Sequence, residues 1–215
     1  MPLTYINIHS HGESLPGTLV NVLKDFDQIP NEGFYSVGLH PWYLNADAQK
    51  EFEKLSKACV KKNVLAVGEC GLDKVCETDM ALQQTWFAKQ VKLANEIKKP
   101  IIIHCVRAYE EVMHMLKDVK VPVLFHGFNK NENVAVKLLE HGYYLSFGKH
   151  LWSENTAQVF KSCPADRFFL ETDNASHKIE EVYEKAVSIR SVPLAEIQNQ
   201  VLDNVQKVFG SKFAV

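Results

Sequence analysis

The sequence contains no long apolar run, and none approaches the roughly 20 residues that a membrane-spanning helix needs. Its start, MPLTYINIHS, lacks the basic residues and apolar centre of a secretory signal. Low-complexity tracts, charge blocks and linker-like changes in composition are missing as well. The 215 residues therefore predict a single domain, residues 1–215, with no membrane attachment and no evident obligate protein partner.

A paired cysteine framework is also absent. The five cysteines are scattered, their number is odd, and none lies in a CxxC motif. This usage is typical of reduced thiols, so we expect a cytoplasmic protein. A general excess of basic residues is missing too, since the formal net charge is −2. That balance argues against nucleic-acid binding over the whole surface, although a local groove could still be basic.

Apolar, strand-like runs alternate with stretches of helical spacing along most of the chain. The strand-like runs are residues 4–9, 17–23, 34–40, 64–69, 100–105, 122–127, 143–148 and 167–173. The helical stretches are residues 46–62, 79–99, 108–118, 131–142, 154–162, 177–191 and 193–209. This alternation predicts an α/β fold with a parallel sheet, either a (β/α) barrel or a doubly wound sheet.

The segment 12–34 departs from this alternation. No helix fits on either side of the run 17–23, although parallel neighbours usually need a crossover of a dozen or more residues. We therefore expect an abbreviated or irregular fold near the N-terminus.

Polar residues gather at the carboxyl ends of the strand-like runs. In parallel α/β folds these ends share one face, where active sites form, so residues far apart in the sequence should converge there. His9 and His11 are two positions apart at a strand end and should point the same way. The residues at the strand ends are His9, His11, His40, Glu69, His104, His126, Lys149, His150 and Asp173.

The residue types at these ends predict a metal site. Imidazoles suit zinc and other first-row ions, and carboxylates can bridge two ions. Four histidines and two carboxylates exceed what one four-coordinate ion can use, which favours two ions sharing a carboxylate. His40 could act in the site or be an ordinary loop histidine. Glu171 could orient a ligand or belong to an internal polar network, and Cys70 and Cys105 are expected to face away from the site.

Six motifs, in order, resemble the TatD-like metal-dependent hydrolases of the amidohydrolase superfamily. They are H-x-H, G-x-HP, GE-x-GLD, IIIHC, HGF and ETD, and the most specific stretches are GLHPWY, AVGECGLDK and QQTWFAKQVKLA. The resemblance covers nearly the whole chain. It implies a (β/α) TIM-type barrel, a two-metal centre and hydrolysis, and members of this family are commonly assigned as deoxyribonucleases.

The resemblance also implies a function for each ligand. His9, His11 and Asp173 would bind one divalent ion (Zn, Mg or Mn), His104 and His126 the other, and Glu69 would bridge the two. Asp173 and Glu69 would be catalytic. The candidates for binding substrate are His40, Arg107, Lys149 and His150.

The sequence departs from the family pattern at several points. Asn7 stands where an aspartate usually precedes H-x-H, HGF replaces H-C-F, HCVRA places Arg107 one position later, and NASHK replaces a proline-rich segment. The chain is also shorter than the ~250 residues typical of this barrel. Three functions therefore compete: a phosphodiesterase acting on DNA, a hydrolase of a small phosphoester, lactone or amide, and a non-catalytic binding protein. The complete ligand set argues against the last of these.

Overall fold

A computed structural model describes residues 5–214 of the chain. Thr4, the first residue of the first predicted strand, and the ends of the predicted 1–215 domain lie outside the described residues. The chain divides into two compact units. The first comprises the described residues up to Val20 together with those from Leu124 onward, and the second comprises Asn21–Val123.

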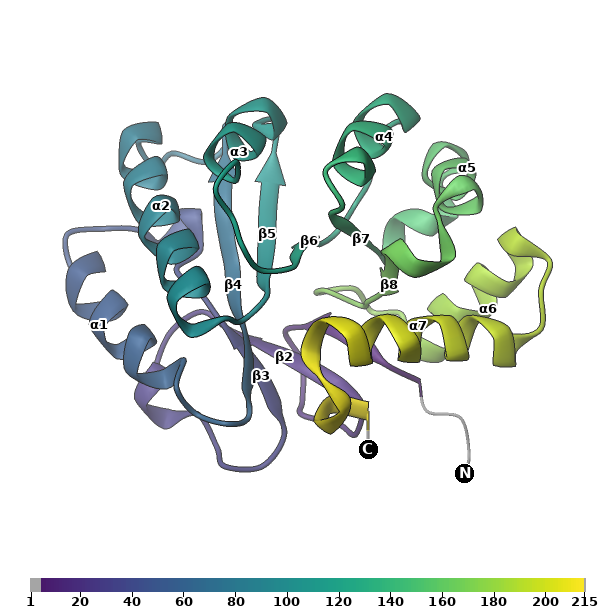
Figure 1. The fold of residues 1–215 in the computed structure, drawn as a ribbon, viewed down its shortest axis with the longest axis horizontal. Helices are drawn as coiled ribbons and strands as arrows, with labels where there is room; N and C mark the ends of the chain where they lie inside the picture. Colours follow the sequence, from purple (N-terminus) through teal and green to yellow (C-terminus); the bar gives the residue numbers. More distant parts are fainter. Residues whose placement is uncertain (1–4, 215) are drawn as a thin grey trace. The chain divides into compact units, whose positions relative to one another are not determined.

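The first unit contains parallel strands, of which the last three along the chain are each followed by a helix (Figure 1). β1 pairs with β2, β6 pairs with β7, and β7 pairs with β8, all in parallel. An isolated bridge between Ser10 and Asp173 joins the ends of β1 and β8. Two of its strands include residues of the second unit: β2 (Thr18–Val22) continues into it, and β6 (Val123–Phe125) begins in it. The other elements of the first unit are β1 (Asn7–Ser10), α4 (Glu132–Glu140), β7 (Tyr144–Phe147), η3 (Lys149–Trp152), α5 (Glu154–Ser162), η4 (Ala165–Arg167), β8 (Phe168–Leu170), α6 (Ile179–Arg190), α7 (Leu194–Phe209) and η5 (Ser211–Ala214).

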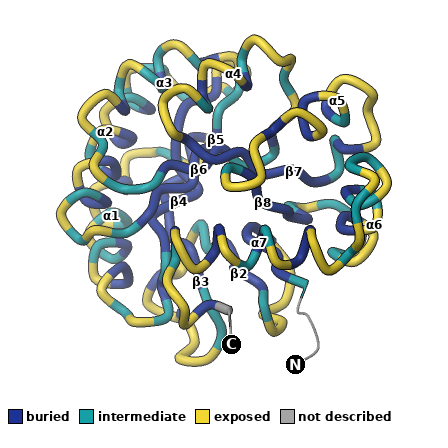
Figure 2. The backbone as a smooth tube through the Cα atoms, turned by 45° about the vertical axis from the view of Figure 1, so that its right-hand side comes forward, coloured by how far each residue is buried: buried dark blue, intermediate teal, exposed yellow. Residues whose placement is uncertain are grey.

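The second unit repeats this arrangement with three further parallel strands. β4 lies between β3 and β5, and α2 packs against β4. The strands are buried, whereas the helices expose one face and bury the other (Figure 2). Its elements are η1 (Phe26–Gln28), β3 (Phe34–Val37), η2 (Pro41–Tyr43), α1 (Ala48–Ala58), β4 (Val64–Asp73), α2 (Met80–Ile97), β5 (Ile101–Val106) and α3 (Tyr109–Met115).

The abbreviated segment predicted near the N-terminus is confirmed. β1 and β2 pair in parallel, yet they are joined only by residues 11–17, which contain no helix. Between β2 and β3 the described chain forms only the short helix η1. A normal crossover helix is therefore missing from two successive connections, which shortens the chain without removing a strand.

All seven predicted helices are present, with ends within a few residues of the predicted ones. One strand differs more, because β4 continues to Asp73, four residues beyond its predicted end at Glu69. Gly71 permits this extension. A Cβ at Gly71 would lie 1.9 Å from the backbone oxygen of His104 on β5, and its φ is +151°. The close approach of two backbones here requires glycine.

The thiols behave as packing groups. Cys59, Cys70 and Cys163 are buried, and burial raises the pKa of Cys59 and of Cys163 to about 12. The Cys70 sulfur lies 3.9 Å from the backbone oxygen of Ile102, inside the second unit. Among residues 5–214, no helix is long and apolar enough to cross a membrane.

Replacing Gly71 with alanine should strongly destabilise the protein, because the added Cβ meets backbone that cannot move aside. We expect a loss of about 3 kcal/mol or more in the free energy of unfolding, measured by denaturant titration. Gly142→Ala is the control, since Gly142 also has a positive φ (76°) but has no atom within 4 Å of an added Cβ. It should cost only about 1–2 kcal/mol. Equal losses for the two variants would contradict the close approach.

Candidate metal centre

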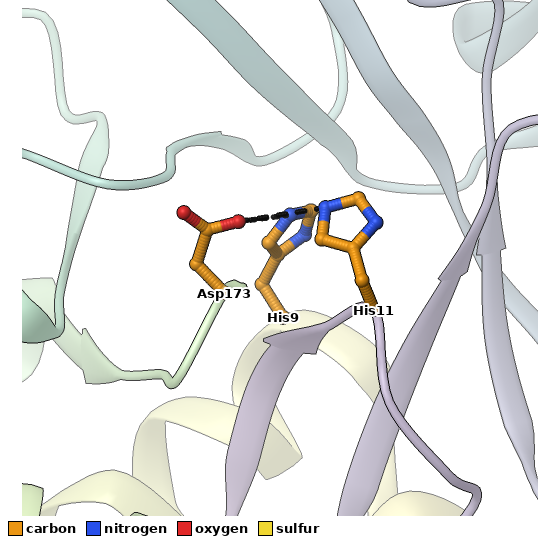
Figure 3. Close-up of side chains that lie close together, drawn as sticks. All are labelled: His9, His11 and Asp173. Atoms are coloured by element: carbon orange, nitrogen blue, oxygen red, sulfur yellow. Dashed lines mark ion pairs between the residues drawn. The ribbon is translucent and has the colours of Figure 1, made fainter. Parts of the chain in front are cut away.

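In the first unit, His9, His11 and Asp173 form a cluster at the ends of β1 and β8 (Figure 3). His11 Nε2 lies 3.4 Å from Asp173 Oδ1, and His9 Nε2 lies 3.9 Å from the same oxygen. His9 is fully buried, whereas the His11 side chain is 30% exposed. One ligand atom from each residue lies within 4.8 Å of the other two, so the three side chains can share one ion.

The asparagine before H-x-H has a structural explanation. Asn7 Nδ2 donates to Thr172 Oγ1 at 2.8 Å, and Asn7 Oδ1 accepts from the Thr172 backbone N–H at 3.0 Å. An aspartate could accept the second bond but could not donate the first. Asn7 therefore ties β1 to the residue immediately before Asp173, and so helps to hold the carboxylate beside the two histidines.

His126 also lies in this unit, beside His9. The two ring centroids are 4.3 Å apart, and His126 Nδ1 is 3.5 Å from Glu171 Oε1. The same Glu171 oxygen accepts the Gly127 backbone N–H at 2.8 Å. Of the two alternatives for the buried Glu171, this contact favours the first, a carboxylate that orients a neighbouring histidine.

The charge of Asp173 is favoured by its neighbours. Burial opposes ionisation, but a hydrogen bond from His11 and nearby positive charge, including that of Lys149, outweigh it and lower the pKa of Asp173 below its usual value. Lys149 Nζ lies 3.2 Å from Asp173 Oδ2 and donates to Asn174 Oδ1 at 2.8 Å. The carboxylate is therefore ionised at neutral pH, as a metal ligand must be.

His150 follows Lys149 on η3 and is half-buried. Its Nε2 is 3.3 Å from the side-chain nitrogen of Asn129. Burial, followed by the charge of Lys149, lowers the pKa of His150 below its usual value. His150 is thus a neutral polar group at neutral pH, and the positive charge at this position comes from Lys149.

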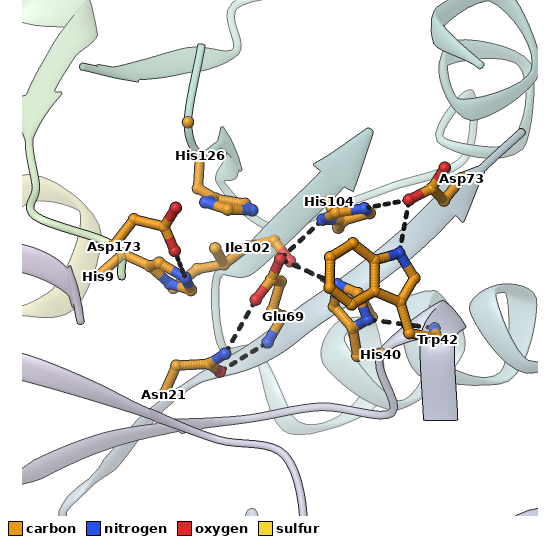
Figure 4. Close-up of polar contacts among 12 residues, drawn as sticks. His9, Asn21, His40, Trp42, Glu69, Asp73, Ile102, His104, His126 and Asp173 are labelled. Atoms are coloured by element: carbon orange, nitrogen blue, oxygen red, sulfur yellow. Dashed lines mark hydrogen bonds and ion pairs between the residues drawn. The ribbon is translucent and has the colours of Figure 1, made fainter. Parts of the chain in front are cut away.

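In the second unit, Glu69 is the centre of a buried cluster with His40 and His104 (Figure 4). Glu69 Oε1 lies 2.8 Å from His104 Nδ1 and 3.2 Å from His40 Nε2. Its other oxygen accepts a hydrogen bond from Asn21 Nδ2 at 3.0 Å, while the Glu69 backbone N–H donates to Asn21 Oδ1 at 2.9 Å. Asn21 therefore fixes both the backbone and the carboxylate of Glu69.

Asp73 holds the other side of His104. His104 Nε2 lies 3.1 Å from Asp73 Oδ2, which also accepts the Trp42 indole N–H at 2.6 Å (Figure 4). Although burial opposes ionisation, the hydrogen bonds from Trp42 and His104 help to lower the pKa of Asp73. An ionised Asp73 favours the form of His104 that carries its proton on Nε2. The other ring nitrogen, Nδ1, is then available to an ion.

Both clusters have the donors that a divalent ion requires. Each offers two imidazole nitrogens and one carboxylate oxygen within 4.8 Å of one another. Mixed histidine and carboxylate sets suit zinc and other first-row ions, and three protein ligands leave coordination positions open for water or substrate. The residues present therefore fit one ion in each cluster.

The sequence did not identify Asn21 and Asp73 as site residues. Asn21 is a buried polar residue between Val20 and Val22 in the strand β2. Asp73 lies at the end of β4, two positions after Gly71 and four after Glu69, on the same face of the alternating pattern. Either pattern could have marked these residues as candidates. Arg107 lies exposed just after β5, with a positive φ of 53°.

Comparison with known proteins assigns the family of the chain. The family described as TatD related DNase matches residues 6–210. An uncharacterized metal-dependent hydrolase of Buchnera aphidicola is 32% identical over 170 residues, which cover 72% of this chain and 63% of that relative, less than two thirds of its length. YcfH of Escherichia coli K12, which carries the same description, is 27% identical over 216 residues, covering 91% of this chain and 80% of the relative.

Solved structures establish the fold. YjjV, a TatD homolog from Escherichia coli K12, matches with a TM-score of 0.80 and 24% identity over 89% of this chain and 85% of its own. A hydrolase TatD family protein from Entamoeba histolytica matches with a TM-score of 0.77 and 20% identity, over 90% and 85% of the two chains. The predicted (β/α) barrel of the metal-dependent hydrolase kind is thereby confirmed. Since the family match covers nearly the whole sequence, the chain belongs to the TatD related DNase family and is a metal-dependent hydrolase of that kind.

Proposed function

We propose that the chain is a phosphodiesterase that hydrolyses DNA with two divalent ions, one in each cluster. The observation that carries this proposal is the pair of histidine and carboxylate clusters at strand ends, His9–His11–Asp173 and His40–Glu69–His104. The family description, TatD related DNase, supports the choice of DNA as substrate. Zn suits both the imidazoles and the carboxylates of these clusters, whereas Mg and Mn suit the carboxylates.

The chemistry follows from what two such ions supply. When bound, divalent ions neutralise charge on a phosphodiester and activate water for attack. Asp173 Oδ1 faces both histidines of its cluster and so holds the ion, while Oδ2 lies beside Lys149 and can accept the proton of the attacking water. Glu69 holds the charge of the second cluster, and its function as a bridge between the two ions stays a prediction.

Four residues are proposed to hold the substrate. The Lys149 ammonium group lies beside a ligand carboxylate, where it can also bind a phosphate oxygen. His150 and Arg107 add a neutral donor and a second cation near strand ends. His40 contacts Glu69 directly, so it can act on either the ion or the substrate of its cluster.

A second candidate substrate is a small phosphoester, lactone or amide. The observation that favours it is the formal net charge of −2, which gives little attraction to a polyanion. Nuclease activity should fall steeply with salt, whereas hydrolysis of a small neutral substrate should not.

We also propose the cytoplasm as location, because a reducing compartment suits five free thiols.

Metal stoichiometry tests the ligand assignment. We expect two ions per chain in the wild type, and one in either His11→Ala or His104→Ala, by elemental analysis of protein that was never exposed to chelator. Each variant removes a ligand from one cluster only. His114→Ala, which changes an exposed histidine on α3, is the control and should retain two ions. An unchanged count in both ligand variants would contradict the assignment.

Asp73→Asn should weaken metal binding at the His104 cluster by about 10- to 100-fold, as removal of a group that orients a ligand typically does. Asp73 Oδ1 accepts the backbone N–H groups of Val75 and Cys76, and Oδ2 accepts from Trp42 and faces His104. The asparagine amide has only one oxygen. Its NH₂ group must therefore face either the two backbone N–H groups or the side chains of Trp42 and His104.

Asp79→Asn is the matched control for this variant. Asp79 caps α2 through Oδ1, and asparagine caps helices equally well. Metal titration by calorimetry should therefore separate the two variants. Wild-type affinity in Asp73→Asn would mean that His104 needs no partner on Nε2.

Neutralising Lys149 and Arg107 together, as Lys149→Met with Arg107→Met, should raise KM for single-stranded DNA. It should also make affinity depend less on salt. The slope of log affinity against log salt concentration should fall by about one unit for each phosphate that the protein no longer binds. A small phosphodiester such as methyl p-nitrophenyl phosphate should be nearly unaffected. Lys57→Met with Lys161→Met is the control, since both lysines are exposed on helices. Equal losses on DNA and on the small ester would assign the two cations to the metal centre or the fold.

A further inference from the structure

A cavity of about 330 Å³ lies within the second unit, and the proposed chemistry makes no use of it. It is formed by the end of β2, the segment around η2 and the start of α1. This volume falls within the range of pockets that hold small organic groups. Its lining residues are Leu23, Lys24, Leu39, His40, Tyr43, Leu44, Asn45, Ala48 and Glu51.

The walls of this cavity are mostly apolar, with a polar rim. Leu39 and Ala48 are buried, and Leu44 is half-buried. Tyr43 stands 58% exposed, an unusual state for a large aromatic side chain that lines a cavity. Such a site suits a flat, largely apolar group that can stack on a ring and still form hydrogen bonds at its edge.

The rim has donors and acceptors of both kinds. Lys24 donates, Glu51 accepts, and Asn45 can do both. Glu51 also pairs with Lys54 at 2.9 Å, so the net charge around the opening is small. A bare phosphate would find no basic pocket here, because Glu51 offsets Lys24, and an alkyl chain would leave the polar rim unused.

His40 connects the cavity to the candidate metal cluster. It lines the cavity, and its Nε2 is 3.2 Å from Glu69 Oε1. The short helix η2 follows at once, and the rings of His40 and Tyr43 are 5.7 Å apart. A group held in the cavity would therefore lie next to a bond held at Glu69, within the same unit.

We propose that this cavity binds the nucleobase of a nucleotide adjoining the phosphodiester that is cleaved; the inference rests on the proposed function. Stacking on Tyr43 would hold any base by its flat face, while the rim would contact its polar edge. Base binding would supply affinity that the net charge of the protein does not provide, and it would place the phosphate at the cluster.

Two variants test the cavity, one by filling it and one by removing its exposed aromatic ring, and each has a matched control. Ala48→Leu fills it at the first residue of α1, where leucine is a good helix former. Ala46→Leu is the matched control, the same change at an exposed position two residues earlier. Tyr43→Ala removes the stacking ring, and Tyr43→Phe keeps it, so the phenylalanine variant should retain binding if stacking is the interaction used.

The experiment measures deoxyadenosine and thymidine binding by calorimetry, with chelator present, because a nucleoside has no phosphate and needs no ion. We expect both nucleosides to bind the wild type, Ala46→Leu and Tyr43→Phe. Ala48→Leu and Tyr43→Ala should weaken binding by about 5- to 100-fold, the range for removal of one base stack. Both variants should also raise KM for a single-stranded oligonucleotide but not for the same strand with an abasic site at the cleavage position.

The outcomes separate this inference from the proposed function. Nucleoside binding that is present in the wild type and weakened in Ala48→Leu, with no hydrolysis of DNA, would support the cavity as a base-binding site and overturn the nuclease. Hydrolysis of DNA by a wild type that binds no nucleoside, or by cavity variants with unchanged KM, would overturn the cavity assignment. Should Ala48→Leu fail to fold, Tyr43→Ala with its phenylalanine partner decides the question alone.

Discussion

The buried carboxylate of Glu69 is the group on which the second unit's site depends. Its side chain is only 3% exposed and is therefore largely desolvated. A buried charge destabilises the folded protein unless it is paired and hydrogen-bonded. Asn21, His40 and His104 meet this requirement from three different elements. The carboxylate therefore needs β2, the segment before η2, and β5 all in place, and the same contacts orient two imidazoles toward one point.

The local backbone is adapted to this group. An added Cβ at Gly38 would lie 2.4 Å from the Glu69 backbone oxygen, and one at Gly71 would lie 1.9 Å from that of His104. Glycines on either side thus let β3, β4 and β5 approach closely around the carboxylate. His104 is then held between two acids, Glu69 and Asp73, so its position is set by hydrogen bonds as well as by its strand.

Much of the fold could be predicted from the sequence, and so could the proximity of His9, His11 and Asp173, because both follow from simple periodicities. The sequence pairs His126 with His104 as ligands, whereas the second candidate cluster pairs His40 with His104. Alternation placed His9 and His11 on one face, and the convergence of strand ends brought Asp173 to them. The supporting residues were harder to predict. The apolar run predicts a strand that ends at Glu69, so Asp73 falls outside the predicted site, whereas β4 continues to Asp73. Asn21 could be marked as a candidate by its place in an apolar run, but it lies within the strand and not at its carboxyl end, so the convergence of strand ends does not pair it with Glu69.

The two clusters have different surroundings, and this has consequences for substrate. His40, Glu69 and His104 are all buried, whereas His11 is 30% exposed and Asp173 lies beside Lys149. In the first unit an amine stands next to the ligand carboxylate, which suits an anionic substrate oxygen. In the second unit an apolar cavity adjoins His40, which suits an uncharged ring.

The central claim is that these clusters hydrolyse the phosphodiester bonds of DNA. The most direct test is turnover of a single-stranded oligonucleotide by chelator-treated full chain to which Mg²⁺, Mn²⁺ or Zn²⁺ is returned, alongside a panel of small esters and amides. We expect cleavage of DNA to be absent before an ion is added, to return with at least one of the three ions, and to weaken steeply as salt rises. No turnover of any nucleic acid with any of these ions, together with clear hydrolysis of a small ester or amide, would contradict it.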